Sequence, residues 1–196
     1  IILYLFPIRS SKINSYILEN VRVLNSVRSN EWELIIVSNF EKNHTLLSKN
    51  RKIKIISSGK VSPAIKRDIG ATISKGKYLV FLDDDSYPNI NFFYELDKLF
   101  LKNKNVTAIG GPAITPINNN YKQKLSGSVF LSKFTGGNPE RYLAQGKLKY
   151  VDDWPTVNFS IKKKEFLNVG GFKNFYWPGE DTFLCYKLNQ KKKKIL

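Results

Sequence analysis

The sequence is poor in the residues that build several common classes of protein. Its only cysteine in 196 residues is Cys185, so no disulfide can form within the chain, and a small secreted protein held together by disulfides is excluded. Cys185 lies in an apolar stretch and is expected in the core. No apolar run approaches the ~20 residues that a membrane-spanning helix needs. A cytoplasmic protein is the expectation that follows.

Acidic residues are scarce compared with basic ones. Lys and Arg number 32 and Asp and Glu 16, which gives a formal net charge of +16. This balance is typical of proteins that meet nucleotide phosphates, an acidic membrane surface or nucleic acid, and equally of a solvated basic surface. Seven of the sixteen acids fall in three tight groups, at 83–85, 152–153 and 180–181. Such grouping indicates a shared task for these acids.

Strand-like and helix-like segments alternate along the chain. We predict strands at 2–8, 32–37, 52–57, 77–82, 106–110 and 157–161, and helices at 13–27, 41–49, 62–74, 89–101, 163–168 and 181–189. Residues 112–150 carry mainly turn and loop signals. The alternation predicts βαβ units, a largely parallel sheet and a single domain over 1–196.

Three consecutive carboxylates follow the apolar strand at 77–82. Asp83, Asp84 and Asp85 would stand at the carboxyl end of that strand, which is where parallel sheets bind ligands. Three like charges repel one another unless a Lys, an Arg or a divalent metal ion lies beside them. The motif predicts a metal site for a phosphate-bearing substrate, and an ordinary Asp-rich turn is the alternative.

Two further elements carry charged side chains that suit such a substrate. Glu180 and Asp181 begin the last predicted helix, where the helix dipole favours acids even without a function. A carboxylate there can also act as general base on an attacking hydroxyl. Arg67 precedes the acidic strand and can either bind phosphate or pair with an acid.

The segment 152–158 adds an acidic pair beside an aromatic residue. Asp153 and Trp154 fit the acceptor side of a sugar site, with the indole as a platform for a sugar ring, or an ordinary loop before a strand. Trp177, just before the acidic pair at 180–181, is assigned to the same side.

The order and spacing of these elements resemble a known family. The segment SPAIKRDIGATISKGKYLVFLDDDSYP (62–88) and the segment VNFSIKKKEFLNVGGFKNFYWPGEDTFLCYKL (157–188) resemble the inverting family 2 glycosyltransferases of the GT-A fold. In that family a strand ends in an Asp-x-Asp motif, and a later Gly-Gly-Phe turn leads to a Glu-Asp pair.

The resemblance implies a fold, a cofactor and roles for residues. It implies an α/β, Rossmann-like, mostly parallel sheet flanked by helices, and Mn²⁺ or Mg²⁺ as cofactor. A sugar would pass in one displacement from a UDP-, GDP- or TDP-linked donor to a glycan or lipid-linked acceptor, in polysaccharide or glycolipid synthesis. The implied residues are Asp85 and Asp83 for the metal, Pro7, Asn39, Arg67, Asp83 and Asp84 for the nucleotide sugar, and Asp181, or else Glu180, as catalytic base.

Several positions depart from the family pattern. Asn39 stands where the family usually has an Asp near the nucleobase, and Asp68 where it commonly has Asn. After the first strand, Pro7 is kept without the usual small polar residues. A His that often ligates the metal beyond the Glu-Asp helix has no counterpart up to Leu196, because the only His is His44. A third metal ligand is therefore expected outside this chain, which would be truncated at its C-terminus.

Other functions remain as alternatives. A degenerate relative would bind a sugar nucleotide without transferring the sugar. A nucleic-acid or anionic-surface binder would explain the net charge, but we expect no nucleic acid, because the acidic groups would repel phosphate without a metal. A nucleotidyltransferase is disfavoured, since the chain has no glycine-rich phosphate loop. The run Lys191–Lys194 suggests peripheral contact with an anionic membrane at its cytoplasmic face.

Overall fold

A sheet of seven strands organises the part of the chain that the computed structural model describes, residues 2–8, 15–27, 32–40, 47, 49–134, 138–144, 146–172 and 178–196. The strand order is β3-β2-β1-β4-β6-β5-β7, and β6 runs antiparallel to both of its neighbours while the other pairings are parallel. The strands are β1 (Ile2–Ile8), β2 (Trp32–Ser38), β3 (Ile53–Ser57), β4 (Tyr78–Leu82), β5 (Val106–Gly110), β6 (Asn158–Lys162) and β7 (Lys194–Ile195). The α/β, mostly parallel architecture is confirmed.

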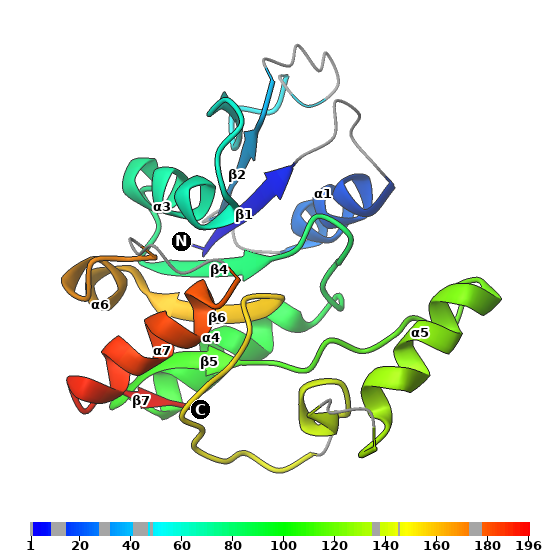
Figure 1. Cartoon of the computed structure of the whole chain (residues 1–196). Coiled ribbons are helices and arrows are strands. Elements are labelled where there is room, and N and C mark those ends of the chain that lie inside the picture. The colour runs from blue at the N-terminus through cyan, green and yellow to red at the C-terminus, as the bar shows by residue number, and fades with distance from the viewer. Residues whose placement is uncertain are drawn as a thin grey trace.

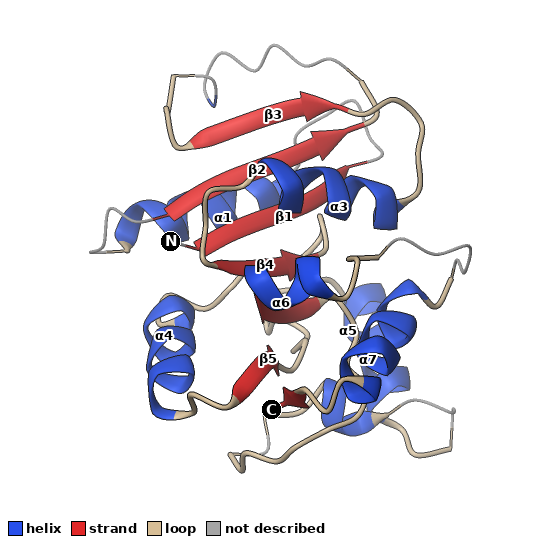
Figure 2. Cartoon of the chain, turned by 90° about the vertical axis from the view of Figure 1, so that its left-hand side faces the viewer, coloured by secondary structure: helices blue, strands red, loops and turns tan. Residues whose placement is uncertain are grey.

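Helices cover both faces of this sheet (Figure 1 and Figure 2). One face packs against α3 (Pro63–Ile73), α6 (Lys163–Asn168) and α7 (Glu180–Gln190), and the other against α1 (Ser15–Ser26) and α4 (Phe92–Lys102). Successive side chains of β4 point to opposite faces of the sheet. Leu79 and Phe81 therefore belong to the core on one face, and Val80 and Leu82 belong to the core on the other. A central strand that is apolar throughout is what this three-layer arrangement requires.

Cys185 lies in the first core, as predicted. Its side chain is buried, and the loss of water raises the pKa of the thiol to about 12. It is therefore a neutral packing residue at physiological pH.

Two sequence-based expectations about the elements were wrong, and one strand was not predicted. Residues 112–150 hold a helix, α5 (Tyr121–Leu131), and a 3₁₀ turn, η1 (Pro139–Arg141), where only loops were expected. Lys194, the last residue of the basic run at 191–194, begins the two-residue strand β7, which pairs with β5 and was not predicted. Helix α4 follows Asn91, and Asn89 instead accepts a hydrogen bond from the Asn91 amide. The helix predicted at 41–49 lies largely outside the described residues.

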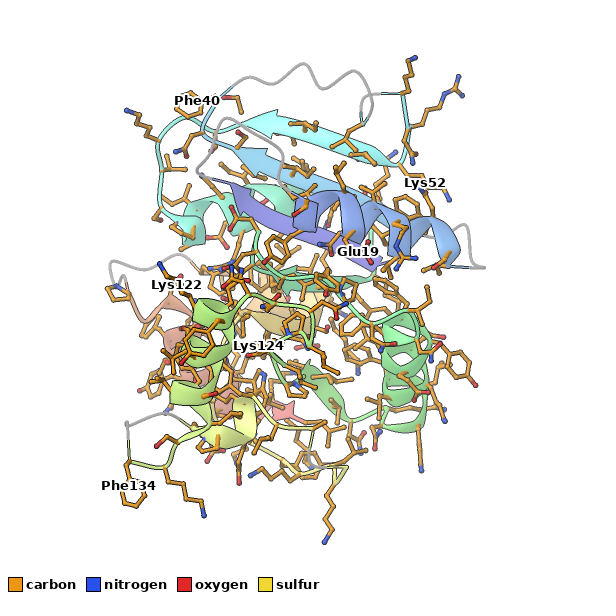
Figure 3. The ribbon with its side chains drawn as sticks, turned by 90° about the vertical axis from the view of Figure 1, so that its right-hand side faces the viewer. Glu19, Phe40, Lys52, Lys122, Lys124 and Phe134 are labelled. Atoms are coloured by element: carbon orange, nitrogen blue, oxygen red, sulfur yellow. The ribbon has the colours of Figure 1, made fainter. Side chains whose placement is uncertain are left out.

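Helix α5 stands apart from the sheet in Figure 1 and has no buried residue. Its N-terminus is closed by a capping box between Asn120 and Gln123, and the Gln123 side chain also donates to the Tyr16 hydroxyl. Figure 3 shows Lys122 and Lys124 on this helix and Phe134 just beyond it. None of the helices within the described residues has both the length and the apolar character needed to cross a bilayer.

Candidate active site

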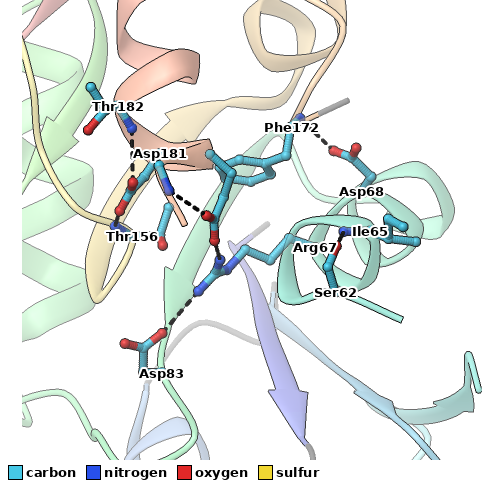
Figure 4. A network of polar contacts seen from close by, with 11 residues as sticks. Ser62, Ile65, Arg67, Asp68, Asp83, Thr156, Phe172, Asp181 and Thr182 are labelled. Atoms are coloured by element: carbon cyan, nitrogen blue, oxygen red, sulfur yellow. Dashed lines mark hydrogen bonds and ion pairs between the residues drawn. The ribbon is translucent and has the colours of Figure 1, made fainter. Parts of the chain in front are cut away.

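Arg67 joins the two acidic segments that the sequence analysis singled out (Figure 4). Ser62 caps α3 and Pro63 opens it, which places Arg67 in the second turn with only 5% of its surface exposed. Its Nη2 donates to Asp83 Oδ1 at 3.0 Å and its Nη1 to Glu180 Oε1 at 3.0 Å. The guanidinium also lies 5.7 Å from the centre of the Phe172 ring. One buried cation therefore holds the end of β4 against the start of α7.

A tight turn presents the three aspartates beyond β4. The Ser86 amide and hydroxyl both donate to the Asp83 carbonyl, at 3.1 and 2.8 Å. Asn20, fully buried in α1, donates to the Ser86 carbonyl at 2.7 Å. Asn20 was not among the predicted site residues, although a polar residue on the apolar face of its predicted helix was a usable signal. Helix α1 thus fixes the turn that carries the acids.

Three adjacent carboxyl groups crowd this turn, with Arg67 as a cation beside Asp83. The pKa of Asp83 is raised, chiefly because the protein removes water from the carboxyl and also because Asp85 and Asp84 lie close, and Arg67 offsets only part of this. Asp85 is exposed and Asp84 is half-buried. Such a turn attracts a further cation.

The carboxylates fit a metal that is held jointly with a substrate. In the described part of the chain, no three Asp, Glu, His or Cys side chains converge closely enough to hold a metal ion on their own. Mg²⁺ and ions like it are usually bound by one or two carboxylates plus substrate phosphates and water. Exposed Asp85, two residues after Asp83 on the same turn, meets this need without a complete protein cage.

The two acids of α7 have different surroundings. Glu180 is 7% exposed, and its two oxygens accept from Arg67 and from the Gly179 amide at 3.2 Å. Asp181 is half-buried, and within the described residues its oxygens accept from backbone N–H groups, those of Thr182 at 2.9 Å and Thr156 at 3.4 Å. Glu180 is therefore tied to the structural network, whereas Asp181 keeps more accessible carboxylate surface.

Asp68 braces the Gly-Gly-Phe turn, a role that sequence analysis missed. Its Oδ1 accepts from the Phe172 amide at 2.8 Å. Gly171 has φ +61°, and a Cβ there would lie 2.4 Å from the same oxygen. The glycine therefore lets the turn approach α3. Of the two neighbouring residues on that helix, Arg67 binds the acidic segments and Asp68 binds the Gly-Gly-Phe turn.

The acceptor-side residues are only partly brought to the surface. Asp153 forms an ion pair with Arg141 at 2.7 Å and accepts a 3.4 Å hydrogen bond from the Thr182 hydroxyl. Trp154 is 8% exposed and lies in the core, donating from Nε1 to the Gly111 carbonyl. The prediction of an indole platform for a sugar is wrong, because Gly110 leaves room for the ring inside the protein. Trp177 lies outside the described residues.

The residues assigned to the nucleotide lie at the same end of the sheet. Pro7 pairs with Val37 one position before β1 ends, and Asn39 directly follows β2. The Oδ1 atom of Asn39 is buried and has no hydrogen-bond partner among the described residues. Since β1, β2 and β4 are parallel, these positions share one edge with Asp83. An unpartnered buried acceptor at that edge suits a donor group of a ligand.

Comparison with known proteins identifies the family. The family model described as glycosyl transferase family 2 matches residues 14–168, more than half of the chain. The chain belongs to glycosyl transferase family 2. An uncharacterized glycosyltransferase of Haemophilus influenzae is 28% identical over 182 residues, covering 83% of this chain and 54% of the relative. The chain thus spans about half the length of the curated relative it matches.

Solved structures share the fold. TarS 1-349 of S. aureus matches 100% of this chain and 57% of its own, with a TM-score of 0.68 and 15% identity. The mannosyltransferase PcManGT from Pyrobaculum calidifontis, solved with GDP-Man and Mn²⁺, matches 100% of this chain and 53% of its own, with a TM-score of 0.67 and 11% identity. These neighbours are GT-A glycosyltransferases, so the GT-A prediction is confirmed.

Proposed function

We propose that this chain is the catalytic part of a metal-dependent, inverting glycosyltransferase that moves a sugar from a nucleoside diphosphate to an acceptor hydroxyl. The observation that carries the proposal is the bridge of Arg67 between Asp83 and Glu180, at 3.0 Å on each side. The bridge joins the acidic turn at 83–85, which suits a metal ion and a phosphate group, to helix α7, which offers a general base. The family membership and a structural neighbour solved with GDP-Man and Mn²⁺ support a nucleotide-sugar donor and a divalent metal.

Donor binding falls to the edge where β1, β2 and β4 end. Asp85, with Asp83, would hold the metal ion, which neutralises charge on the leaving diphosphate when bound. Asn39 offers its buried Oδ1 to an N–H of the nucleobase, and Asp84 lies near the ribose. Arg67 keeps Asp83 in place and does so from a rigid helix.

Asp181 is the proposed base. It takes the proton from the acceptor hydroxyl, whose oxygen then bonds to the anomeric carbon while the bond from that carbon to the diphosphate breaks. The backbone N–H groups of Thr156 and Thr182 orient its carboxylate. Glu180 is the less suitable choice, because both of its oxygens are already engaged. Attack from the face opposite the leaving group inverts the configuration.

Calorimetric titration of UDP, GDP and TDP, each with Mn²⁺ and with EDTA, tests the donor site. One nucleotide should bind in the presence of Mn²⁺ and bind far less in EDTA. Asp85→Ala should abolish the metal-dependent part while leaving the melting temperature unchanged, because Asp85 is exposed.

Asp97→Ala is the matched control, since Asp97 is an exposed acid on α4. It should bind the nucleotide as the wild type does. Metal-dependent binding that survives in Asp85→Ala contradicts the assigned metal site. A folded protein that binds none of the three nucleotides contradicts the proposed donor site and favours a degenerate relative.

A further inference from the structure

A second concave surface lies at the end of the sheet opposite the aspartates. Strand β6 runs antiparallel to β4, so Lys162 pairs with Tyr78 at the start of β4, whereas Asp83 follows Leu82 at its other end. Five strand residues separate the two ends by about 16 Å. The surface is a pocket of about 330 Å³, lined by Lys104, Asn105, Thr107, Lys162, Glu165, Lys192, Lys193 and Lys194. We call it the lysine pocket.

Three segments that are distant in sequence build the lysine pocket. The turn before β5 brings Lys104, the end of β6 brings Lys162, and the turn from α7 into β7 brings the remaining lysines. Strand β7 is registered on β5 through the pairing of Lys194 with Val106. The Nζ atom of Lys162 donates to the Lys104 carbonyl at 2.7 Å. The pocket is thus a product of the tertiary fold and not of the C-terminal lysine run alone.

Charge in the lysine pocket is far from balanced. Its lining holds five lysines and one acid, Glu165, which leaves a formal charge of +4. Glu165 forms an ion pair with Lys193 at 2.8 Å. The pKa of Lys162 is lowered, chiefly by loss of water around the amine; Glu165 opposes this shift, and the nearby cations Lys77 and Lys193 add to it. An anion placed here would relieve repulsion that the protein itself leaves uncompensated.

The backbone at Lys192 is held in an unfavourable conformation. Its φ of +52° is the only positive value at a non-glycine residue within the described residues. The Lys192 amide donates to Asn189 O and the Lys193 amide to Leu188 O, a helix-ending pattern that normally uses glycine. Lysines near a helix C-terminus also interact favourably with the helix dipole, but this interaction does not require a lysine at the position of positive φ. Strain retained at a lysine of the pocket favours a use for its ammonium group.

We propose that the lysine pocket binds a multiply charged phosphate group, supplied either by a soluble phosphate compound or by the headgroup of an anionic lipid. Several ammonium groups converging from three segments suit a compact anion with more than one negative charge. The site is separate from the proposed donor site and needs no metal.

Titration with pyrophosphate in EDTA tests the proposal, because EDTA prevents metal-assisted binding at Asp85. The wild type should bind pyrophosphate, and Asp85→Ala should bind it equally well. Lys192→Gly removes one ammonium group and relieves the strained φ, so affinity should fall about fivefold while the melting temperature does not fall. A merely structural lysine would give the stability change without the loss of affinity.

Lys98→Gln is the matched control, since Lys98 is an exposed lysine on α4 outside the pocket. It should leave the affinity for pyrophosphate unchanged. An equal loss in Lys98→Gln and Lys192→Gly would overturn the proposal in favour of general charge attraction. Absence of pyrophosphate binding by the wild type, or unchanged affinity in Lys192→Gly, would overturn it as well.

Vesicles separate the two sources of the phosphate group. Wild type and Lys192→Gly are sedimented with phosphatidylcholine vesicles with and without phosphatidic acid. Binding that needs phosphatidic acid and weakens in Lys192→Gly assigns the pocket to a lipid headgroup. Pyrophosphate binding without vesicle binding assigns it to a soluble phosphate compound. Vesicle binding that is insensitive to Lys192, together with no effect of Lys192→Gly on pyrophosphate, overturns the proposal.

Discussion

The two ends of the sheet carry opposite charge on the same framework. Where β4 ends, Asp83 begins a run of three aspartates, and Arg67 pairs with both Asp83 and Glu180. At the other end five lysines surround Glu165. Net charge therefore says little about a partner, because a chain of formal charge +16 gathers acids at one end of the sheet and lysines at the other. Within the described residues, Arg67 at the acidic end and Glu165 at the basic end are counter-charges that can be removed by mutation.

Removing Arg67 should have the largest effect. Arg67→Met leaves the carboxylate of Glu180 buried without its partner and loosens Asp83, so we expect a loss of about 3–5 kcal/mol in the free energy of unfolding. Urea denaturation measures it. Arg22→Met, which breaks an exposed pair with Glu19, is the control and should leave the free energy of unfolding almost unchanged.

The double variant Arg67→Met/Glu180→Gln sharpens this test. Because the unpaired charge is then removed, it should be more stable than Arg67→Met alone. Costs that simply add would mean that Arg67 stabilises the fold through packing on Phe172 and not through the ion pairs.

The turn beside Arg67 offers a second, smaller test. Gly170→Ala and Gly171→Ala both place a side chain at positive φ, +80° and +61°, which costs about 1–2 kcal/mol each. Only Gly171→Ala also displaces Asp68 from the Phe172 amide, for about 1 kcal/mol more. Urea denaturation of both variants measures the difference. The difference in the free energy of unfolding between the two variants should disappear when both also carry Asp68→Ala. A difference that persists would mean that the new side chain at 171 crowds Phe166 instead.

The acidic end was more predictable from sequence than its surroundings. Asp83 and Glu180 belong to patterns of neighbouring residues, so the resemblance placed them in one site before any contact was known. Trp154 was misassigned because its burial depends on Gly110, which is distant along the chain and leaves space for the ring. Burial of this kind is set by tertiary packing, which a local pattern does not contain.

The missed elements share another physical cause. Helix α5 has no buried face, so hydrophobic periodicity could not reveal it, although its Asn120-Gln123 capping box was a readable signal. Strand β7 has two residues and exists because β5 lies beside it. The lysine pocket depends on that pairing, and the charge run alone therefore showed only part of it.

The smallest predicted effects concern pH, and they should have opposite signs at the two ends. The pKa of Asp83 is raised in the fold, so the folded state holds its proton longer and its carboxyl lowers stability as pH rises through that pKa. Asp83→Asn should therefore gain stability relative to the wild type with rising pH.

The pKa of Glu165 is lowered, chiefly by its hydrogen bond from Lys193, so its contribution is present at neutral pH and lost as pH falls through that pKa. Glu165→Gln should cost less than about 1 kcal/mol at neutral pH and nothing in acid. Urea denaturation between about pH 3 and 7 measures both. Slopes of the same sign would contradict the raised pKa of Asp83 and would mean that its pairing with Arg67 outweighs the loss of water.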